Sequence, residues 1–235
     1  RCFGGRQLFL RHESEECGGP MELSIYLPPQ ARDEPVPVVY FLSGLTCTAA
    51  NFTEKAGAQR LASSLGLAIV CPDTSPRGDA VPDAAERYDL GHGAGFYVNA
   101  TRQPWSKHYH MYDYVVKELP ALIEANFPVV PGLKSITGHS MGGHGALICA
   151  LKNPGVFRSV SAFAPICNPL QSGWGEACFG AYLGDNRTDW EAYDATCLVQ
   201  AGAKASPILI DQGTADEFLA EHLFPQNLQA ACEAA

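Results

Sequence analysis

Short apolar runs alternate with amphipathic stretches along most of the chain. Apolar runs rich in β-branched residues and closed by turn residues are typical of strands buried in a sheet. They predict strands over Val36–Leu42, Gly66–Cys71, Lys134–Thr137, Ser159–Phe163 and Pro207–Ile210, and the alternating residues of Met21–Leu27 predict an antiparallel strand. Buried strands that alternate with helices form a mostly parallel sheet with helices on both faces. The pattern therefore predicts an α/β fold.

The segments between these strands carry the helical spacing of apolar residues. It predicts helices over Thr53–Leu65, Met111–Ala125, the residues after Gly138 to about Leu151, Gly173–Leu183, Asp189–Leu198, and from Glu217 onward. Pro120 should kink the second of these, because proline removes a hydrogen bond from a helix interior. Ligands of such folds bind beyond the carboxyl ends of the strands. The loops after Leu42, Thr137 and Ile210 are therefore expected to form the functional site.

Composition narrows the classes of partner. With 46% hydrophobic and 17% charged residues, the chain has the composition of a folded domain, and its 235 residues suit one domain over 1–235. The net charge of −9 argues against nucleic acid or an anionic membrane as the main partner. No apolar stretch reaches the roughly 18 residues that a membrane span needs. Nine cysteines, an odd number, with no Cys-x-x-Cys pair and no visible signal peptide, favour a reducing cytosol and offer no metal site.

The pentapeptide Gly138-His139-Ser140-Met141-Gly142 matches the G-x-S-x-G pattern. It follows an apolar strand and opens a helix, which is the setting of a nucleophile elbow. Small neighbours let strand and helix approach closely, so that the serine hydroxyl projects above the sheet. We therefore predict an α/β-hydrolase fold with Ser140 as the nucleophile. His139 and His144 flank the elbow and are expected to be structural histidines.

An acyl-transfer enzyme must also stabilise a tetrahedral oxyanion with preorganised backbone amides. One amide should be that of Met141, the residue after the nucleophile. The other should come from the loop after Leu42, where Gly44 lets the backbone turn inward. Leu45 is the expected donor.

The acid of a catalytic triad follows the nucleophile along the chain in α/β-hydrolases. Two aspartates compete for this role after the strand that ends at Ile210. Asp211 lies at the strand end, where it can pair locally. Asp216 lies beyond the Gly213 turn, where its carboxylate can reach a histidine, so we predict Asp216 as the acid.

Several longer motifs accompany these residues. They are Cys2-Phe-Gly-Gly5, Leu42–Cys47, Asp73-Thr-Ser-Pro-Arg-Gly78, Gly93-Ala-Gly-Phe-Tyr-Val98, Gly138–Cys149 and Ala162-Phe-Ala-Pro-Ile-Cys-Asn-Pro169. With them the chain closely resembles the S-formylglutathione hydrolase family, also called the esterase D family, over nearly its whole length. The resemblance implies hydrolysis of S-formylglutathione to glutathione and formate in formaldehyde detoxification, and a carboxylesterase side activity. It also implies a cytoplasmic homodimer without a cofactor.

The family's serine, aspartate and oxyanion donors match Ser140, Asp216, Leu45 and Met141. The resemblance also places the thiol of Cys47 near the nucleophile. Trp174 is either a wall of the acyl pocket or a core residue, and Arg77 is expected in an internal salt bridge rather than on a glutathione carboxylate. Three rival functions remain open: a general small-acyl carboxylesterase, an acyltransferase, and a non-catalytic binding protein of the same fold.

The general base is the piece that the sequence does not supply. Only His222 follows Asp216, and it should stand at the flank of the sheet, inside the last predicted helix. In the family, that helix is followed by one more strand, a loop with the catalytic histidine and a final helix. We therefore expect a C-terminally incomplete domain, with the general-base histidine beyond residue 235.

Overall fold

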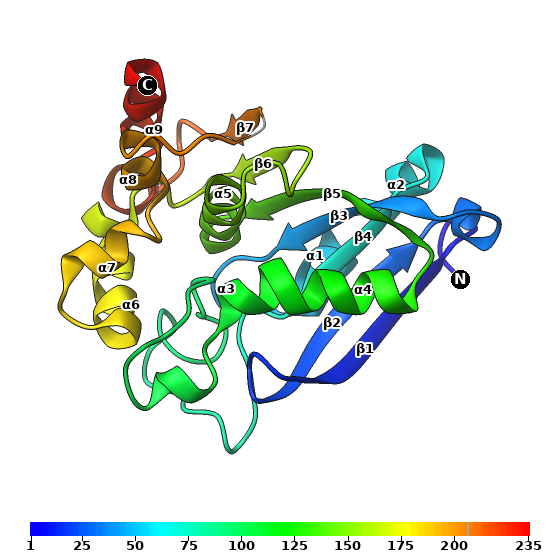
Figure 1. Cartoon of the computed structure of the whole chain (residues 1–235), viewed down its shortest axis with the longest axis horizontal. Coiled ribbons are helices and arrows are strands. Elements are labelled where there is room, and N and C mark those ends of the chain that lie inside the picture. The colour runs from blue at the N-terminus through cyan, green and yellow to red at the C-terminus, as the bar shows by residue number, and fades with distance from the viewer. Residues whose placement is uncertain (206) are drawn as a thin grey trace.

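A sheet of seven strands runs through the residues that the computed structural model describes, 1–205 and 207–235 (Figure 1). The strands are β1 (Arg6–Ser14), β2 (Gly19–Leu27), β3 (Val36–Leu42), β4 (Ala68–Pro72), β5 (Val129–His139), β6 (Val160–Phe163) and β7 (Ile208–Asp211). Their order across the sheet is β1-β2-β4-β3-β5-β6-β7. The five strands from β4 to β7 pair in parallel, and β1 and β2 add an antiparallel ribbon. The predicted α/β-hydrolase class is thereby confirmed.

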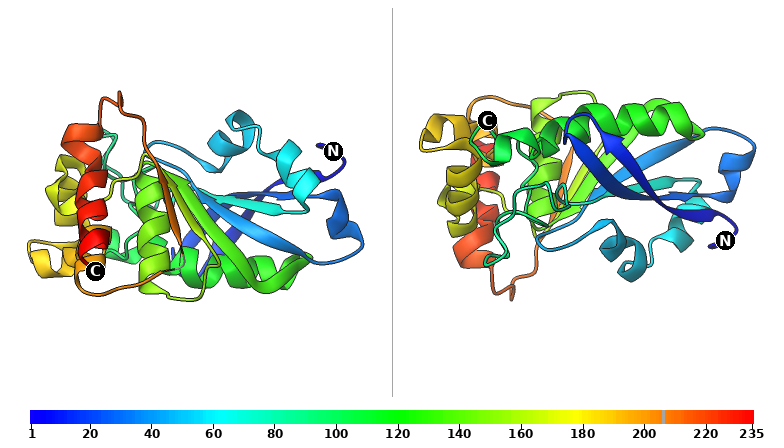
Figure 2. Two further views of the ribbon diagram at one scale, coloured as in Figure 1. Left: turned by 90° about the horizontal axis from the view of Figure 1, so that it is seen from above. Right: turned by 90° about the horizontal axis from the view of Figure 1, so that it is seen from below.

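The helices cover both faces of this sheet. They are α1 (Ala49–Lys55), α2 (Gln59–Leu65), α3 (Met111–Asp113), α4 (Leu119–Asn126), α5 (Met141–Lys152), α6 (Gly173–Leu183), α7 (Arg187–Glu191), α8 (Ala195–Gln200) and α9 (Pro225–Ala234). Figure 2 shows α1 and α2 on one side of the sheet and α4 on the other. Helix α5 is buried through Leu151 and packs on β5 and β6. This central helix carries the elbow at its first turn.

Two predicted helices are each divided in two. The stretch predicted as Thr53–Leu65 forms α1 and α2, because Gly57 adopts a left-handed φ of 65° between them. The stretch predicted as Asp189–Leu198 forms α7 and α8, because Asp194 caps a new helix by accepting a hydrogen bond from the Cys197 amide. Single-helix predictions were wrong there because local capping outweighs apolar spacing.

Four other features refine the prediction. The strand β1 was missed, because it is a half-exposed edge strand with polar residues at both ends. The predicted kink at Pro120 is a π-helical stretch, η3 (Tyr114–Glu118), that directly precedes α4. Pro37 lies where the β3–β5 register shifts, as expected of a residue that cannot donate to the ladder. The helix predicted from Glu217 begins as η5 (Leu219–Leu223) and restarts as α9 after Phe224, whose φ is 50°.

Candidate active site

Ser140 occupies the sharp turn between β5 and α5. Its φ of 57° and ψ of −120° lie in a region that residues with a side chain rarely adopt. Three hydrogen bonds hold this strained backbone. The Ser140 amide donates to the Phe163 carbonyl at 2.9 Å, and the Ser140 carbonyl accepts from the His144 amide at 3.0 Å and from the Ile166 amide at 3.4 Å. Phe163 at the end of β6 and Ile166 shortly after it thus hold the turn through both the amide and the carbonyl of Ser140.

The glycines of the pentapeptide are required by close backbone approach. A Cβ on Gly142 would lie 2.0 Å from the Leu42 carbonyl oxygen, and a Cβ on Gly138 would lie 2.1 Å from the Gly142 carbonyl oxygen. Any side chain at either position would force α5 away from β3 and β5. The pattern read in the sequence is therefore the packing requirement of this elbow.

The loop after β3 lies against Ser140. A Cβ on Gly44 would stand 3.2 Å from the Cβ of Ser140. In the described part of the chain, no protein acceptor is bonded to the amide of the next residue, Leu45. Met141 is the first residue of α5, where helix amides have no acceptor within the helix. The two predicted oxyanion donors therefore belong to segments that meet at Ser140.

Of the two candidate acids, Asp216 is the one that interacts with the elbow. Its charge acts on the neighbouring His139, where it opposes the lowering of the histidine pKa by burial. Its carboxylate accepts hydrogen bonds from the Phe218 amide at 2.9 Å and from Gln212 Nε2 at 3.2 Å. Asp211 ends β7 and is exposed. This environment favours Asp216, which remains an assignment by position.

The two histidines beside Ser140 are poor candidates for the base. His144 is fully buried in α5, and its Nε2 is 3.0 Å from the Phe96 carbonyl oxygen. Burial lowers the pKa of His144 to about 4. His139 precedes the nucleophile at the end of β5. Within residues 1–205 and 207–235, no histidine ring is hydrogen-bonded to the Ser140 hydroxyl.

His222 and Trp174 belong to one aromatic cluster. Their rings stack at 3.8 Å with an interplanar angle of 9°, and Phe218 packs beside them. The indole of Trp174 donates to the Tyr88 hydroxyl at 2.8 Å, and His222 Nδ1 lies 3.2 Å from Ser172 Oγ. His222 thus lies in η5 and packs against α6, and Trp174 is a buried packing residue. Its role as a pocket wall stays a prediction.

Arg77 donates a hydrogen bond to the backbone carbonyl of Cys47. The Cys47 thiol is half-buried, and burial raises its pKa above the ordinary value of 9.0. Arg77 Nε bonds the Asp73 carboxylate at 2.9 Å, which confirms the predicted internal salt bridge. Its Nη2 also reaches the Cys47 carbonyl at 3.1 Å, a contact that sequence reasoning missed. The Asp73–Gly78 motif was the available signal, since it had no role in the predicted site.

The described residues hold no group of three or more metal-ligating side chains and no helix that could cross a membrane.

The comparisons with known proteins then bear directly on the site. Residues 14–235 match the Esterase family model, described as "Putative esterase". The chain is 57% identical to the S-formylglutathione hydrolase of Mus musculus and 56% identical to that of Rattus norvegicus, over 99% of this chain and 83% of each relative. The chain belongs to the S-formylglutathione hydrolase family.

Solved structures agree with this family assignment. An S-formylglutathione hydrolase from Agrobacterium tumefaciens superposes with a TM-score of 0.99 at 51% identity, covering 100% of this chain and 85% of that one. A fluorophosphonate-binding serine hydrolase of Staphylococcus aureus superposes with a TM-score of 0.74 at 19% identity, covering 98% of this chain and 85% of that one, and shares the fold. The protein is accordingly an enzyme of the serine hydrolase class.

Proposed function

We propose that the protein hydrolyses S-formylglutathione to glutathione and formate, with Ser140 as the nucleophile. The observation that carries this proposal is the strained elbow at Ser140 packed against the Gly44 loop, within a chain more than half identical to enzymes of that name. The elbow provides acyl transfer, and the relatives indicate the acyl donor.

The reaction follows from the residues in order. A histidine base takes the proton of the Ser140 hydroxyl as Oγ attacks the formyl carbonyl carbon. The amides of Leu45 and Met141 bind the developing oxyanion. The carbon–sulfur bond then breaks, and the glutathione thiolate takes the proton back from the histidine. A water molecule, deprotonated by the same histidine, then attacks the formyl ester. Formate leaves as the bond to Ser140 Oγ breaks, the histidine returns the proton to Oγ, and Asp216 orients the imidazole throughout.

The proposed base is a histidine outside residues 1–235. Each of the seven histidines has another environment: His139 and His144 flank the elbow, His222 stacks on Trp174, and the other four bond or pair elsewhere in residues 12–118. The relatives extend further than the matched region, since the chain covers 83% of their length. We therefore propose that the base histidine is not among the seven histidines of residues 1–235.

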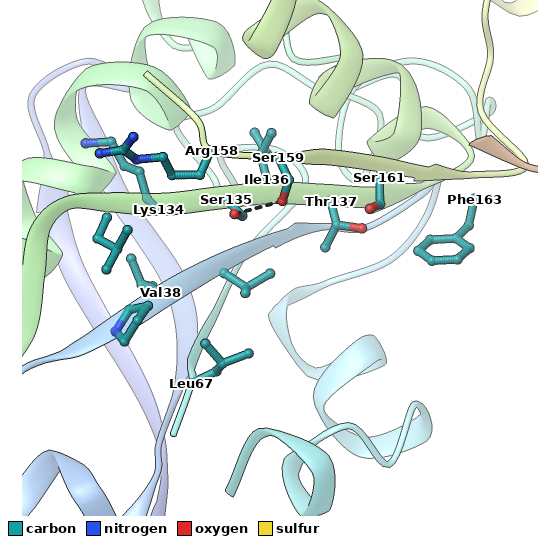
Figure 3. A pocket seen from close by; sticks show the side chains of 13 residues that line it. Val38, Leu67, Lys134, Ser135, Ile136, Thr137, Arg158, Ser159, Ser161 and Phe163 are labelled. Carbon is teal, nitrogen blue, oxygen red and sulfur yellow. Dashed lines mark hydrogen bonds between the residues drawn. The ribbon is translucent and has the colours of Figure 1, made fainter. Parts of the chain in front are cut away.

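An open area of the sheet supports the same proposal. The face of the sheet that carries α1 and α2 has a hollow of about 440 Å³, lined by residues of β3, β5 and β6 such as Val39, Thr137 and Phe163 (Figure 3). Phe163 is 39% exposed there, and Leu209 of β7 is 57% exposed. Such apolar positions are normally covered. We propose that the segment carrying the base histidine covers this face.

Measuring the intact mass of the purified native protein tests whether the base lies outside residues 1–235. The proposal expects a mass above the 25.2 kDa of residues 1–235 for the active enzyme. Full hydrolase activity in a protein of 25.2 kDa would contradict it and would require a base within this chain. In that case His139, whose pKa is affected by the charge of Asp216, would be the first histidine to replace by mutagenesis.

A general small-acyl carboxylesterase is the second candidate, because nothing in the elbow itself selects a thioester. Steady-state kinetics of the full-length enzyme on S-formylglutathione and on p-nitrophenyl acetate separate the two. The proposal expects a higher kcat/KM for the thioester. An equal or higher kcat/KM for the aryl ester would favour the carboxylesterase. Labelling of Ser140 by a fluorophosphonate without turnover of either substrate would point to an acyltransferase, and no labelling to a binding protein.

The remaining expectations also stay proposals. We infer that the enzyme acts in the cytoplasm, in formaldehyde detoxification, because S-formylglutathione is the product expected when the adduct of formaldehyde and glutathione loses two electrons to an oxidant. We infer a homodimer, as implied by the resemblance to the family. Light scattering of the full-length protein measures its mass in solution, and a monomer at micromolar concentration would contradict the dimer.

A further inference from the structure

The loop between β3 and α1 holds a backbone shape that needs external support. Thr46 adopts a left-handed φ of 66°, a conformation that is strained for a residue with a branched Cβ. The loop also carries Leu45, the proposed oxyanion donor. A donor on a strained loop keeps its direction only if neighbouring groups fix the backbone on both sides.

Two side chains donate hydrogen bonds to a single atom of this loop. The carbonyl oxygen of Cys47 accepts a hydrogen bond from Thr74 Oγ1 at 2.5 Å and from Arg77 Nη2 at 3.1 Å. Thr74 is fully buried. The guanidinium bond is charge-assisted and therefore stronger than a neutral one. The peptide that follows Thr46 is thus held by one neutral and one cationic donor.

Asp73 holds the guanidinium in place. Arg77 Nε bonds Oδ2 of Asp73 at 2.9 Å and Nη2 bonds Oδ1 at 3.1 Å, a bidentate geometry that only arginine provides. Asp73 is 2% exposed, and its Oδ1 also accepts from the Thr74 amide at 2.6 Å. The buried carboxylate therefore orients both Arg77 and Thr74 toward the loop.

A second contact secures the loop from the other side. The Thr46 amide donates to the Gly93 carbonyl at 2.9 Å, and the Gly93 amide is bonded to Ser75 Oγ at 2.8 Å. A Cβ on Gly93 would stand 3.0 Å from Thr46 Cα and 3.4 Å from Arg77 Nη2. The segments 73–77 and 93–95 therefore enclose the loop, and their motifs acquire a role that the triad does not give them.

We propose that Thr74 and Arg77 are positioning residues of the oxyanion hole, which act on the reaction by fixing the Leu45 amide through the Cys47 carbonyl. The inference rests on the proposed site around Ser140. It does not depend on which acyl substrate the enzyme prefers, because every ester or thioester forms the same oxyanion.

Thr74 offers a matched pair of substitutions in the full-length enzyme. Thr74→Ser keeps the hydroxyl donor, and Thr74→Val keeps the shape without the donor. We expect Thr74→Val to lower kcat on p-nitrophenyl acetate by roughly 10- to 100-fold with KM changed less than about twofold, since misplaced catalytic groups cost rates of this order. Thr74→Ser should stay close to wild type.

Substitutions of Arg77 distinguish the effect of its charge from that of its hydrogen-bonding geometry. Arg77→Lys keeps a cation beside Asp73 but lacks the fork that reaches Asp73 and Cys47 together, so it should lower kcat almost as much as Arg77→Met. Lys117→Met is the control, because it breaks another ion pair between residues four apart, with Asp113, and Lys117 contacts no residue of the loop. It should leave kcat unchanged.

Affinity for a trifluoromethyl ketone, which forms a tetrahedral adduct with a serine nucleophile, provides the second readout. The proposal expects this affinity to fall in parallel with kcat in Thr74→Val and Arg77→Met, while the thermal midpoints of Thr74→Val and Thr74→Ser stay similar. Wild-type kcat in both variants, or a fall that Arg77→Lys fully rescues, would overturn the proposal. A wild type that hydrolyses the ester but not S-formylglutathione would contradict the proposed function alone.

Discussion

Gly44 and Ser140 are in contact across the site: a Cβ on Gly44 would stand 3.2 Å from the Cβ of Ser140 and 3.3 Å from the His139 carbonyl oxygen. Real Cβ atoms seldom approach other atoms this closely, so the loop after β3 can lie against Ser140 only because residue 44 has no side chain. The distance between the loop and the elbow is therefore set by one glycine.

Gly44→Ala should push the loop away from Ser140 by a few tenths of an ångström. We expect kcat to fall by roughly 10-fold, because oxyanion donors act over hydrogen-bond distances, while the thermal midpoint changes little. Gly19→Ala is the control, because a Cβ at that position meets no atom within 4 Å. Unchanged kcat in Gly44→Ala would show that the loop tolerates the displacement or does not bind the oxyanion.

Asp216 and Asp211 can be distinguished by the same substitution. Asp216→Asn should lower kcat on the order of 10⁴-fold, as expected of the acid in a triad. Asp211→Asn should retain near-normal turnover, because Asp211 is exposed at the end of β7. Steady-state kinetics of the two full-length variants decide between them, and the opposite ranking would assign the acid to Asp211.

Bulky thiol reagents should inhibit the enzyme by blocking the oxyanion loop at Cys47. Burial raises the pKa of this thiol above 9.0, so the reactive thiolate is scarce at neutral pH. The rate of inactivation should therefore rise about tenfold for each pH unit from 7 to 9. Cys47→Ser should remain active and resist inactivation. Equal sensitivity of that variant would place the reactive thiol elsewhere.

His144 should make the protein sensitive to mild acid. Burial lowers its pKa from 6.5 to about 4, so the unfolded chain binds the proton more readily. The stabilisation is complete above pH 6.5 and is lost as the pH falls toward 4. Between pH 7 and 5 it should decrease by about 2 kcal/mol.

The measurement is urea unfolding of wild type and His144→Gln at both pH values. Glutamine can still donate to the Phe96 carbonyl but does not titrate in this range. Raised pKa values of buried carboxyls such as Asp73 and Asp194 act in the opposite direction in both proteins, so the comparison cancels them. An identical pH dependence of the two proteins would contradict the prediction.

The sequence predicted the sheet and the elbow because both depend on local residue patterns. Local patterns indicated these elements without any tertiary information: the apolar runs of β3, β5 and β6, and the small residues around Ser140. Neighbouring helices, such as α1 and α2 on either side of Gly57 or α7 and α8 on either side of Asp194, were merged, because their apolar spacing continues across the break. The edge strand β1 has no such run and was missed.

Contacts between distant segments could not be predicted in the same way. The hydrogen bonds from Thr74 and Arg77 to Cys47 join residues 27 to 30 positions apart. Motif residues marked these segments without showing what they touch. Similarly, stacking of His222 on Trp174 depends on how α6 and η5 pack, which no local pattern encodes.

The central claim, that Ser140 is the nucleophile of a thioesterase, is tested most directly by Ser140→Ala in the full-length enzyme. The measurement is the initial rate of S-formylglutathione hydrolysis by wild type and variant, with circular dichroism to show that both are folded. We predict that wild type hydrolyses S-formylglutathione and that Ser140→Ala lowers kcat on the order of 10⁶-fold. A folded Ser140→Ala protein that kept a tenth of the wild-type rate would contradict it.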